Sequence, residues 1–443
     1  MIDLFSIIYV INALPMIGLL EFTYVHDLLW EYVQEITDKP SYLNDVIQQL
    51  ADAAPKLMST KPGAKVVCVV ATYAGAKERK RLVKSLKGKV MESLLHPSAH
   101  LAVMRIIDVT DDTVNVQKSL LDEIKSTEPI FKYAANGEVI GKPLPALVSI
   151  SKHYFGRKLL LRLLNPAKSH LEPDETLLFS TESPTSKKSP DVRRAEHLVY
   201  LKSSLLFVAT AYVEDLLTCK FGSKVFEEIV WVFRPVNTLK SVVRLLTGDH
   251  LDVVVEEGGR NEQVDGLKET NNSDEEQIDE TDAPASEDVS INENDDEAVV
   301  FEAIEEEEAG EEADTGAAND SEQFSMPIEE NPYAQAVLKS LLLLEAYSED
   351  SAVNLKRRDH VDRRMWEESE FSLASHIITA LVEKSLLEQW LTHNRTCFAL
   401  LDCLRVPSAS SYIKKVISAH IEVLRSSAHE HKGGSLLLER LEL

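Results

Sequence analysis

The sequence predicts an all-α protein in which helical repeats stack into an α-solenoid. Three observations carry this prediction: apolar residues recur at helical spacing along most of the chain, a short motif returns seven times, and glycine is scarce, with 16 in 443 residues. A repeated helical unit cannot bury its apolar face alone and must stack on its neighbours. The length of the chain also exceeds what one hydrophobic core usually serves.

The helical spacing is clearest in residues 77–95. The apolar residues there follow at steps of three and four: Leu82, Val83, Leu86, Val90 and Leu94. This spacing is typical of one face of an amphipathic helix. Similar patterns occupy residues 114–124, 198–217, 225–233, 334–344, 373–387 and 411–424. Alternation with a period of two is rare, which disfavours hairpins and sandwiches.

The repeated motif consists of a small residue, one or two polar or basic residues, and then an apolar run. Its copies are residues 60–67, 96–103, 153–160, 219–226, 331–338, 393–400 and 431–438. The shortest spacings are 35 residues from Gly63 to Ser98 and 37 residues from Thr396 to Gly433. Both match the length of a helix-pair repeat in a solenoid. Helix pairs joined by short turns are therefore the expected unit.

The net charge of −26 comes from one segment of the chain. Residues 256–330 hold 29 Asp and Glu against Arg260 and Lys268, whereas the other 368 residues hold 44 acidic and 45 basic side chains. The overall acidity therefore does not exclude a polyanionic partner. We expect this acidic insertion to be disordered, because its composition buries too little apolar surface to offset the entropy of ordering. It is either a solvated spacer or a competitor with nucleic acid for a basic face.

Basic residues concentrate in residues 77–89, where seven of them stand against one acid, Glu78. They are Lys77, Arg79, Lys80, Arg81, Lys84, Lys87 and Lys89. Further basic or polar candidates in the neighbouring motifs are Lys61, Lys65, His100, Arg157 and Lys158. Each neutralised phosphate releases counterions, so such residues bind nucleic acid without reading its sequence. The alternative is a solvated helix face that keeps the protein soluble.

No pattern indicates catalysis, a cofactor or a metal. The chain lacks a dinucleotide-binding glycine motif, a phosphate-binding loop, a nucleophile elbow and the zinc-protease motif. Asp111, Asp112 and Thr113 precede a helical pattern and are expected to cap a helix. His429 and His431 fit an exposed turn better than a metal site.

The four cysteines, Cys68, Cys219, Cys397 and Cys403, lack paired metal-ligand spacing and indicate a reducing compartment. The first 20 residues are apolar, and no Lys or Arg precedes Lys39, which disfavours a signal peptide. We expect a buried helix there, or a start site that truncates a longer protein.

Several stretches resemble the nucleolar, penguin-type Pumilio proteins, in which Pumilio repeats are followed by a CPL domain. They are residues 22–24, 60–67, 76–80, 108–113, 155–164 and 191–194, and the resemblance extends from about residue 20 to residue 443, interrupted by the acidic insertion. It implies an armadillo-type array of Pumilio-like repeats in residues 21–130 and CPL-type repeats in residues 131–255 and 331–443. Residues 1–20 form an apolar segment, and residues 256–330 form the acidic insertion.

The resemblance further implies a nuclear and nucleolar protein that binds RNA, or DNA, with little sequence preference. It implies roles in ribosome biogenesis, pre-rRNA processing or translational control. The partners expected on this basis are structured RNA or pre-rRNA, duplex DNA and ribosome-assembly proteins, without a membrane, a cofactor or a small-molecule substrate. The alternative is an armadillo- or HEAT-like scaffold that binds proteins and has no direct contact with nucleic acid.

Sequence-specific Pumilio repeats read one base each through side chains of one helix per repeat. By resemblance these positions are Ala64, Lys65 and Cys68; Ala99, His100 and Val103; Arg157, Lys158 and Leu161; and Ser223, Lys224 and Glu227. Only the last set has the Ser and Glu expected of a base reader. The prediction is therefore that the protein holds the nucleic-acid backbone and does not read bases.

Overall fold

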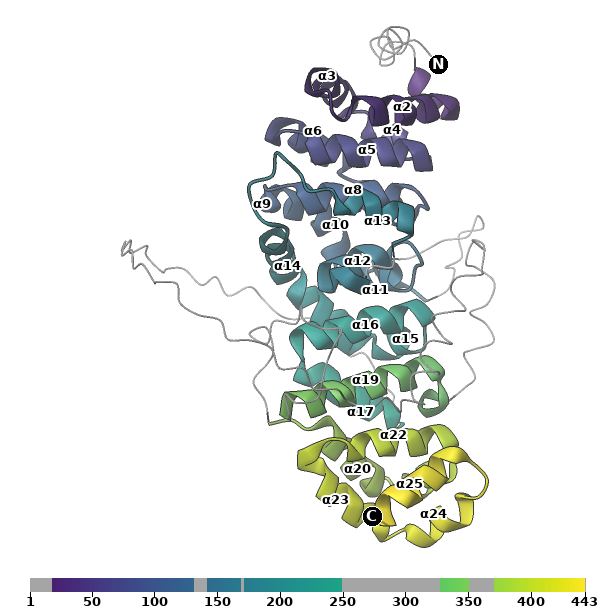
Figure 1. Cartoon of the computed structure of the whole chain (residues 1–443). Coiled ribbons are helices and arrows are strands. Elements are labelled where there is room, and N and C mark those ends of the chain that lie inside the picture. The colour runs from purple at the N-terminus through teal and green to yellow at the C-terminus, as the bar shows by residue number, and fades with distance from the viewer. Residues whose placement is uncertain (1–17, 131–141, 169–170, 249–326, 350–369, 443) are drawn as a thin grey trace, which may run out of the picture. The chain divides into compact units, whose positions relative to one another are not determined.

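A computed structural model describes residues 18–130, 142–168, 171–248, 327–349 and 370–442, which belong to one compact unit (Figure 1). These residues are mostly helical, so the prediction of an all-α repeat fold is confirmed. The strand pairing among them is one short antiparallel pair, β1 (Pro129–Ile130) with β2 (Leu144–Pro145). The predictions for residues 1–17 and for most of the acidic insertion lie outside the described residues.

The helices of the first part follow one another with short connections. They are η1 (Leu19–Glu21), α2 (Thr23–Ile36), α3 (Pro40–Leu50), α4 (Ala54–Leu57), α5 (Lys61–Tyr73), α6 (Ala76–Leu86), α7 (Val90–Leu95), α8 (Ala99–Val109), α9 (Thr113–Val116), the π-turn η2 (Gln117–Leu121) and α10 (Asp122–Lys125). Each of these helices is followed within a few residues by the next.

The middle part includes one long helix, α14. Its elements are α11 (Ala146–Ser151), α12 (Arg157–Leu164), η3 (Pro166–Lys168), α13 (Pro173–Ser180), α14 (Pro190–Ala211), α15 (Val213–Leu217), α16 (Lys220–Phe233) and α17 (Val236–Leu246). The C-terminal part contains η6 (Ile328–Glu330), α19 (Pro332–Glu349), α20 (Leu373–Glu383), α21 (Leu387–Thr392), α22 (Asn394–Leu404), α23 (Pro407–Ser418), α24 (Ile421–Ser427) and α25 (Lys432–Glu442).

A helix begins within each copy of the repeated motif: α5, α8, α12, α16, α19, α22 and α25. In five copies the side chain of the first motif residue accepts a hydrogen bond from a backbone N–H two or three residues later. These residues are Thr60, His96, His153, Asn331 and His431. Thr60 is thus the N-cap of α5, and the other four side chains likewise pair backbone N–H groups at or just before a helix start, which the helix itself leaves unpaired.

Glycine in the fourth motif position has a steric reason. A Cβ atom on Gly63 would lie 2.0 Å from the carbonyl oxygen of Leu57 in the preceding helix, and one on Gly222 would lie 2.9 Å from that of Leu216. Gly433, in the third position of its copy, shows a similar close approach, 2.5 Å from the carbonyl oxygen of Asn394. The backbone of a neighbouring helix thus passes too close to these positions for a side chain.

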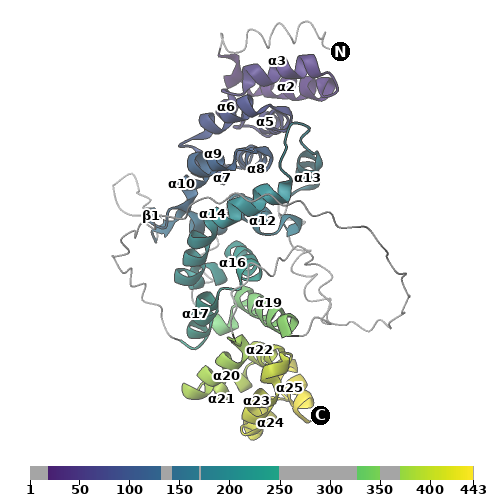
Figure 2. The ribbon, with the colours of Figure 1, turned by 90° about the vertical axis from the view of Figure 1, so that its left-hand side faces the viewer.

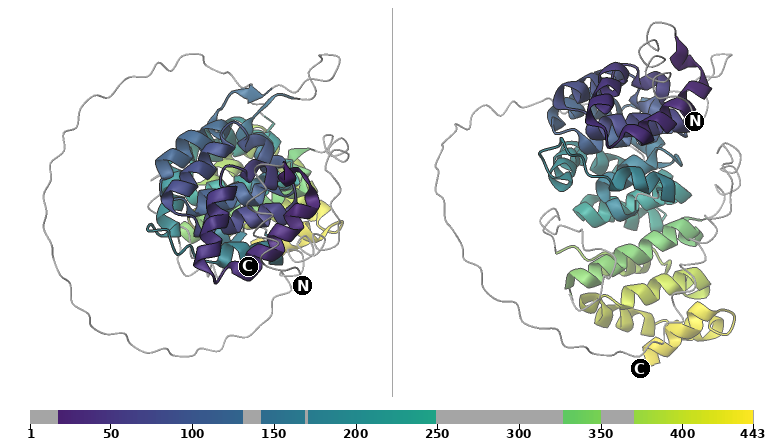
Figure 3. Two further views of the ribbon diagram at one scale, coloured as in Figure 1. Left: turned by 90° about the horizontal axis from the view of Figure 1, so that it is seen from above. Right: turned by 45° about the horizontal axis from the view of Figure 1, so that its top comes forward.

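The helices that begin at the motif also make much of the core. Helix α5 packs between α2 and α8, and α16 packs between α12 and α19, followed by α22 and α25. Figure 3 shows successive helices lying over one another in chain order. Trp231 and Trp390 are fully buried, and the apolar residues of all parts form one continuous cluster. Stacking of repeats therefore buries apolar faces that no single helix pair covers.

The predicted helical patterns correspond to observed helices. The pattern in residues 77–95 divides into α6 and α7, because Gly88 between them has a positive φ of 80°. Asp112 caps α9 through the backbone N–H of Asn115, as expected for this cluster. None of the described helices is long and apolar enough to cross a membrane.

Candidate nucleic-acid interface

Five lysines form an exposed group on α6 and the turn that follows it. Leu82, Val83 and Leu86 anchor the opposite side of α6 in the core. We call the exposed group the α6 lysine face: Lys77, Lys80, Lys84, Lys87 and Lys89. None of the five forms an ion pair with another described residue. Their charges are therefore available to phosphates, and no acid of the described chain has to be displaced first.

Arg81 lies on the same helix but is already paired. Its Nε lies 3.1 Å from Asp52 Oδ2, and its Nη1 donates to the carbonyl oxygen of Gln48 at 2.9 Å. The hydrogen bond from Arg81 holds the pKa of the Asp52 carboxyl below its usual value. Arg81 therefore fixes α6 to the end of α3, and its charge is largely compensated.

Arg79 does not fit the prediction that all seven basic residues of 77–89 contact nucleic acid. Its side chain is 3% exposed, and its guanidinium donates to the carbonyl oxygens of Ala71 and Thr72, both at 3.0 Å. It also donates to Ser183 Oγ at 2.5 Å and Thr185 Oγ1 at 2.7 Å. Burial lowers the pKa of Arg79 to about 10. In this structure Arg79 is a buried link between helices and a later loop.

The other candidates lie at the starts of α5, α8 and α12, beneath α13. Lys61 and Lys65 on α5 both reach Asp174, at 3.2 and 2.9 Å. Lys158 on α12 is 1% exposed and pairs with Glu175 at 3.0 Å. The structure therefore brings Lys61, Lys65 and Lys158 to one helix of the chain itself, separate from the α6 lysine face.

His100 and Arg157 are also buried. The ring of His100 lies 5.0 Å from that of Phe155, and burial lowers the pKa of His100 to about 4. Arg157 is 2% exposed and lies over the ring of Phe221, at 4.1 Å. The five candidates of the neighbouring motifs are thus covered or paired within the chain: Lys61, Lys65, His100, Arg157 and Lys158.

The positions that would read bases are mostly inaccessible. Cys68, Val103 and Leu161 are at most 1% exposed, and Ser223 is 5% exposed. Glu227 accepts a hydrogen bond from Ser340 Oγ at 2.6 Å, so even the Ser and Glu set is committed to internal contacts. A base edge would find few free donors or acceptors here.

Three further arginines were absent from the sequence-based candidates: Arg105, Arg162 and Arg193. They lie close to Asp108 and Asp111, with Arg162 Nη2 2.8 Å from Asp108 and Arg193 Nη1 3.0 Å from Asp111. The signal for Arg105 and Arg162 is that each occupies a mostly apolar helical pattern, where a charged residue needs a buried partner; Arg193 lies among polar residues and offers no such signal. No group of three or more His, Cys, Asp or Glu among the described residues could hold a metal ion.

The fold and the capped, stacked helices define an α-helical repeat protein, and comparisons with known proteins agree. Residues 152–258 match the CPL (NUC119) domain. The structure resembles that of human Puf-A, crystallised free and in complex with DNA. In the free form the TM-score is 0.62 at 18% identity, over 95% of this chain and 62% of that chain.

The curated relatives are Pumilio-type proteins. The chain is 26% identical over 214 residues to Pumilio homology domain family member 6 of Schizosaccharomyces pombe (47% of this chain, 30% of the relative). It is 27% identical over 194 residues to human Pumilio homolog 3 (43% and 27%). It is 22% identical over 192 residues to Drosophila melanogaster protein penguin (43% and 23%). The resemblance to penguin-type Pumilio proteins with a CPL domain is confirmed, although the match covers less than a third of each relative.

Proposed function

We propose that the chain binds nucleic acid by holding the sugar–phosphate backbone on the α6 lysine face, with little preference for sequence. The observation that carries this proposal is the group of five exposed lysines without an ion-pair partner among the described residues. Lysine contacts to phosphates position a strand but carry no sequence information. The complex of human Puf-A with DNA supports the choice of ligand class.

The buried positions that would read bases support the proposal that binding has little preference for sequence. Because Cys68, Val103 and Leu161 are covered, the chain offers few side chains for hydrogen bonds to base edges. We further propose RNA as the natural ligand, in the nucleolus, with a role in ribosome biogenesis or translational control. This extension, like the proposal that the chain binds without catalysing a reaction, is supported by the similarity to Pumilio-type relatives.

Fluorescence anisotropy with single-stranded RNAs of unrelated sequence, and with duplex DNA, tests the proposal. We expect the RNAs to bind within about tenfold of one another, with affinity falling steeply as salt increases. A preference of about a thousandfold for one RNA would contradict backbone binding, because such ratios are typical of base readout. Absence of binding at low salt would favour the protein scaffold.

A second test compares the RNA affinity of the full chain with that of a variant that lacks the acidic insertion. Residues 256–330 carry a formal charge of −27, with 29 acidic and two basic side chains. If this segment competes with nucleic acid for the α6 lysine face, its deletion raises RNA affinity most at low salt. Equal affinities of the full chain and the deletion variant would instead identify the segment as a spacer.

A further inference from the structure

The segment between α12 and α14 runs along the repeat helices, from the starts of α5 and α12 to the ends of α5 and α8. We call residues 171–189 the strap; it contains α13 and the loop that leads to Ser189, the N-cap of α14. Figure 1 shows α13 in front of α8, and Figure 2 shows it on the side of α8 away from α9 and α10. The strap thus covers the helix starts where the reader positions of α5, α8 and α12 lie.

The first part of the strap offers carboxylates to lysines. Asp174 lies 3.2 Å from Lys61 Nζ and 2.9 Å from Lys65 Nζ, and Glu175 lies 3.0 Å from Lys158 Nζ. The pKa of Asp174 is lowered, chiefly by the hydrogen bond from Lys65. Each carboxylate takes the place that a phosphate oxygen takes beside lysine in a nucleic-acid complex.

An aromatic ring follows the carboxylates. Phe179 is 8% exposed, and its ring centroid lies 4.4 Å from the guanidinium carbon of Arg162 and 5.8 Å from that of Arg105. In RNA complexes, unstacked bases pack on arginine guanidinium planes in a similar way. An aromatic ring packed against guanidinium groups is therefore the second feature that the strap shares with a bound strand.

The loop after α13 supplies neutral oxygen acceptors. Arg105 donates to the carbonyl oxygen of Thr181, and Arg79 donates to the hydroxyls of Ser183 and Thr185. The same hydroxyls donate onward to the carbonyl oxygens of Thr72 and Ala74, each at 2.7 Å. Arg79 and Arg105 thus find hydrogen-bond acceptors within the strap, and no external anion is required to pair with them.

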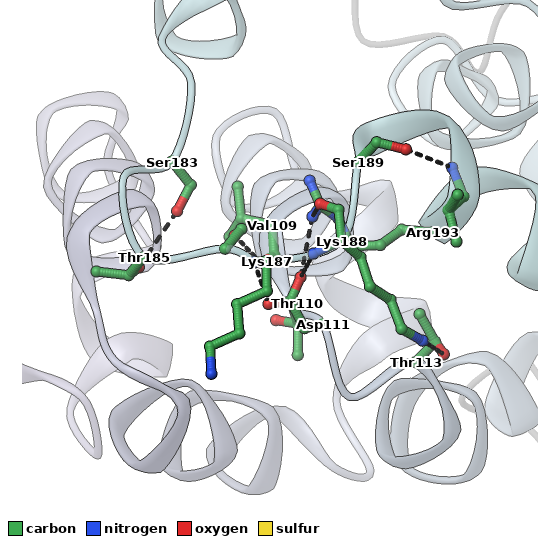
Figure 4. A network of polar contacts seen from close by, with 12 residues as sticks. Val109, Thr110, Asp111, Thr113, Ser183, Thr185, Lys187, Lys188, Ser189 and Arg193 are labelled. Atoms are coloured by element: carbon green, nitrogen blue, oxygen red, sulfur yellow. Dashed lines mark hydrogen bonds and ion pairs between the residues drawn. The ribbon is translucent and has the colours of Figure 1, made fainter. Parts of the chain in front are cut away.

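Hydrogen bonds also hold the C-terminal end of the strap against the rest of the chain (Figure 4). Asp111 accepts from the backbone N–H groups of Lys187 and Lys188, at 2.6 and 3.2 Å, and from Arg193 at 3.0 Å. These bonds hold the pKa of the Asp111 carboxyl below its usual value against the opposing effect of its burial. Ser186 donates to the carbonyl oxygen of Val109 at 2.7 Å. The loop is therefore bonded along its length to the ends of α5 and α8.

We infer that the strap is a built-in substitute for a nucleic-acid strand, which closes the face made by α5, α8 and α12. Nucleic acid is then confined to the α6 lysine face. This inference rests on the proposed function, because it assigns the surface on which that function takes place. It also explains why cations buried under the strap coexist with lysines left unpaired on α6.

Hydrogen exchange on the full chain, with and without oligouridine at low salt, gives the first test. We expect the amides of residues 76–90 to exchange more slowly when RNA is bound and those of residues 173–188 to keep their rates. Faster exchange in residues 173–188 on adding RNA would overturn the inference, since it would show that RNA displaces the strap.

Opening the strap gives the second test. Asp174→Asn releases Lys61 and Lys65, and it is expected to raise oligouridine affinity about threefold, as for the loss of a surface ion pair. Glu182→Gln is the matched control, because it removes one charge from an exposed strap carboxylate that makes no ion pair with a described residue. Circular dichroism establishes that both variants fold. Adding Phe179→Ala to the Asp174→Asn variant is expected to raise its oligouridine affinity further.

The outcomes separate this inference from the proposed function. Equal affinities of Asp174→Asn and Glu182→Gln would show that the closed face is not competent for RNA and would overturn the inference alone. RNA binding by Asp174→Asn but not by the unaltered chain would support the strap's role and remove the α6 lysine face from the proposed function. Absence of binding by every variant would overturn both.

Discussion

Charge reversal on the α6 lysine face gives the sharpest prediction. The triple variant Lys80→Glu, Lys84→Glu and Lys87→Glu changes exposed side chains that pair with no described residue. For single-stranded nucleic acid, each phosphate contact contributes about 0.7 to the slope of log affinity against log salt. If all five lysines contact phosphates, the slope is about −3.5, and removing three lowers its magnitude by about 2.

This slope can be expressed as an affinity ratio. Between about 50 and 200 mM salt, the unaltered chain is expected to lose roughly a hundredfold in RNA affinity, and the triple variant about sevenfold. Fluorescence anisotropy titrations at several salt concentrations measure both slopes.

The control reverses three exposed lysines in other helices: Lys339 in α19, Lys415 in α23 and Lys432 in α25. It changes the net charge by the same amount and should keep the original slope. If both triple variants lower the slope equally, the chain binds through its overall charge, and the reasoning from the α6 lysine face is refuted.

Three predictions concern stability. Gly63→Ala should lower the free energy of unfolding by about 1–3 kcal/mol, since its Cβ would lie 2.0 Å from a carbonyl oxygen of the preceding helix; denaturant titration measures this. Lys158→Ala leaves the buried Glu175 carboxylate without its cation and should cost about 3–5 kcal/mol, whereas replacing both residues by apolar ones should cost less. Burial lowers the pKa values of His100 and His197 from 6.5 to about 4, so the unfolded chain binds more protons between these values. Stability should therefore be complete above about pH 6.5 and fall as the pH drops toward 4, and a melting temperature that stays constant from pH 7 to 5 would contradict this.

The helices were predictable because their signals are local. The spacing of Leu82, Val83 and Leu86 identifies the buried side of α6 without knowledge of its neighbours. The repeated motif is visible as a unit in the sequence, whereas the hydrogen bonds that Thr60 and the equivalent residues accept near the helix starts are visible only in the structure. Stacking of repeats then followed from the need to bury one face of each helix.

The candidate interface was less predictable because burial of a charge depends on distant segments. Arg79 could have been assigned correctly, since it lies three residues before Leu82 and four before Val83 on the apolar side. Lys158 offered no such signal, because its partner Glu175 belongs to the strap, which folds back over α12. Whether a basic residue is available to bind nucleic acid therefore depends on where the tertiary structure places the acidic residues that can pair with it.

Crosslinking of bound RNA to the full chain, followed by mass spectrometry of the crosslinked peptides, tests the central claim most directly. Photoreactive uridine in a single-stranded RNA marks the side chains that lie against the strand. The account predicts crosslinks in residues 76–90, on α6 and the turn to α7, and none beneath α13. Crosslinks concentrated in α19–α25, or at the starts of α5, α8 and α12 with the strap in place, would contradict it.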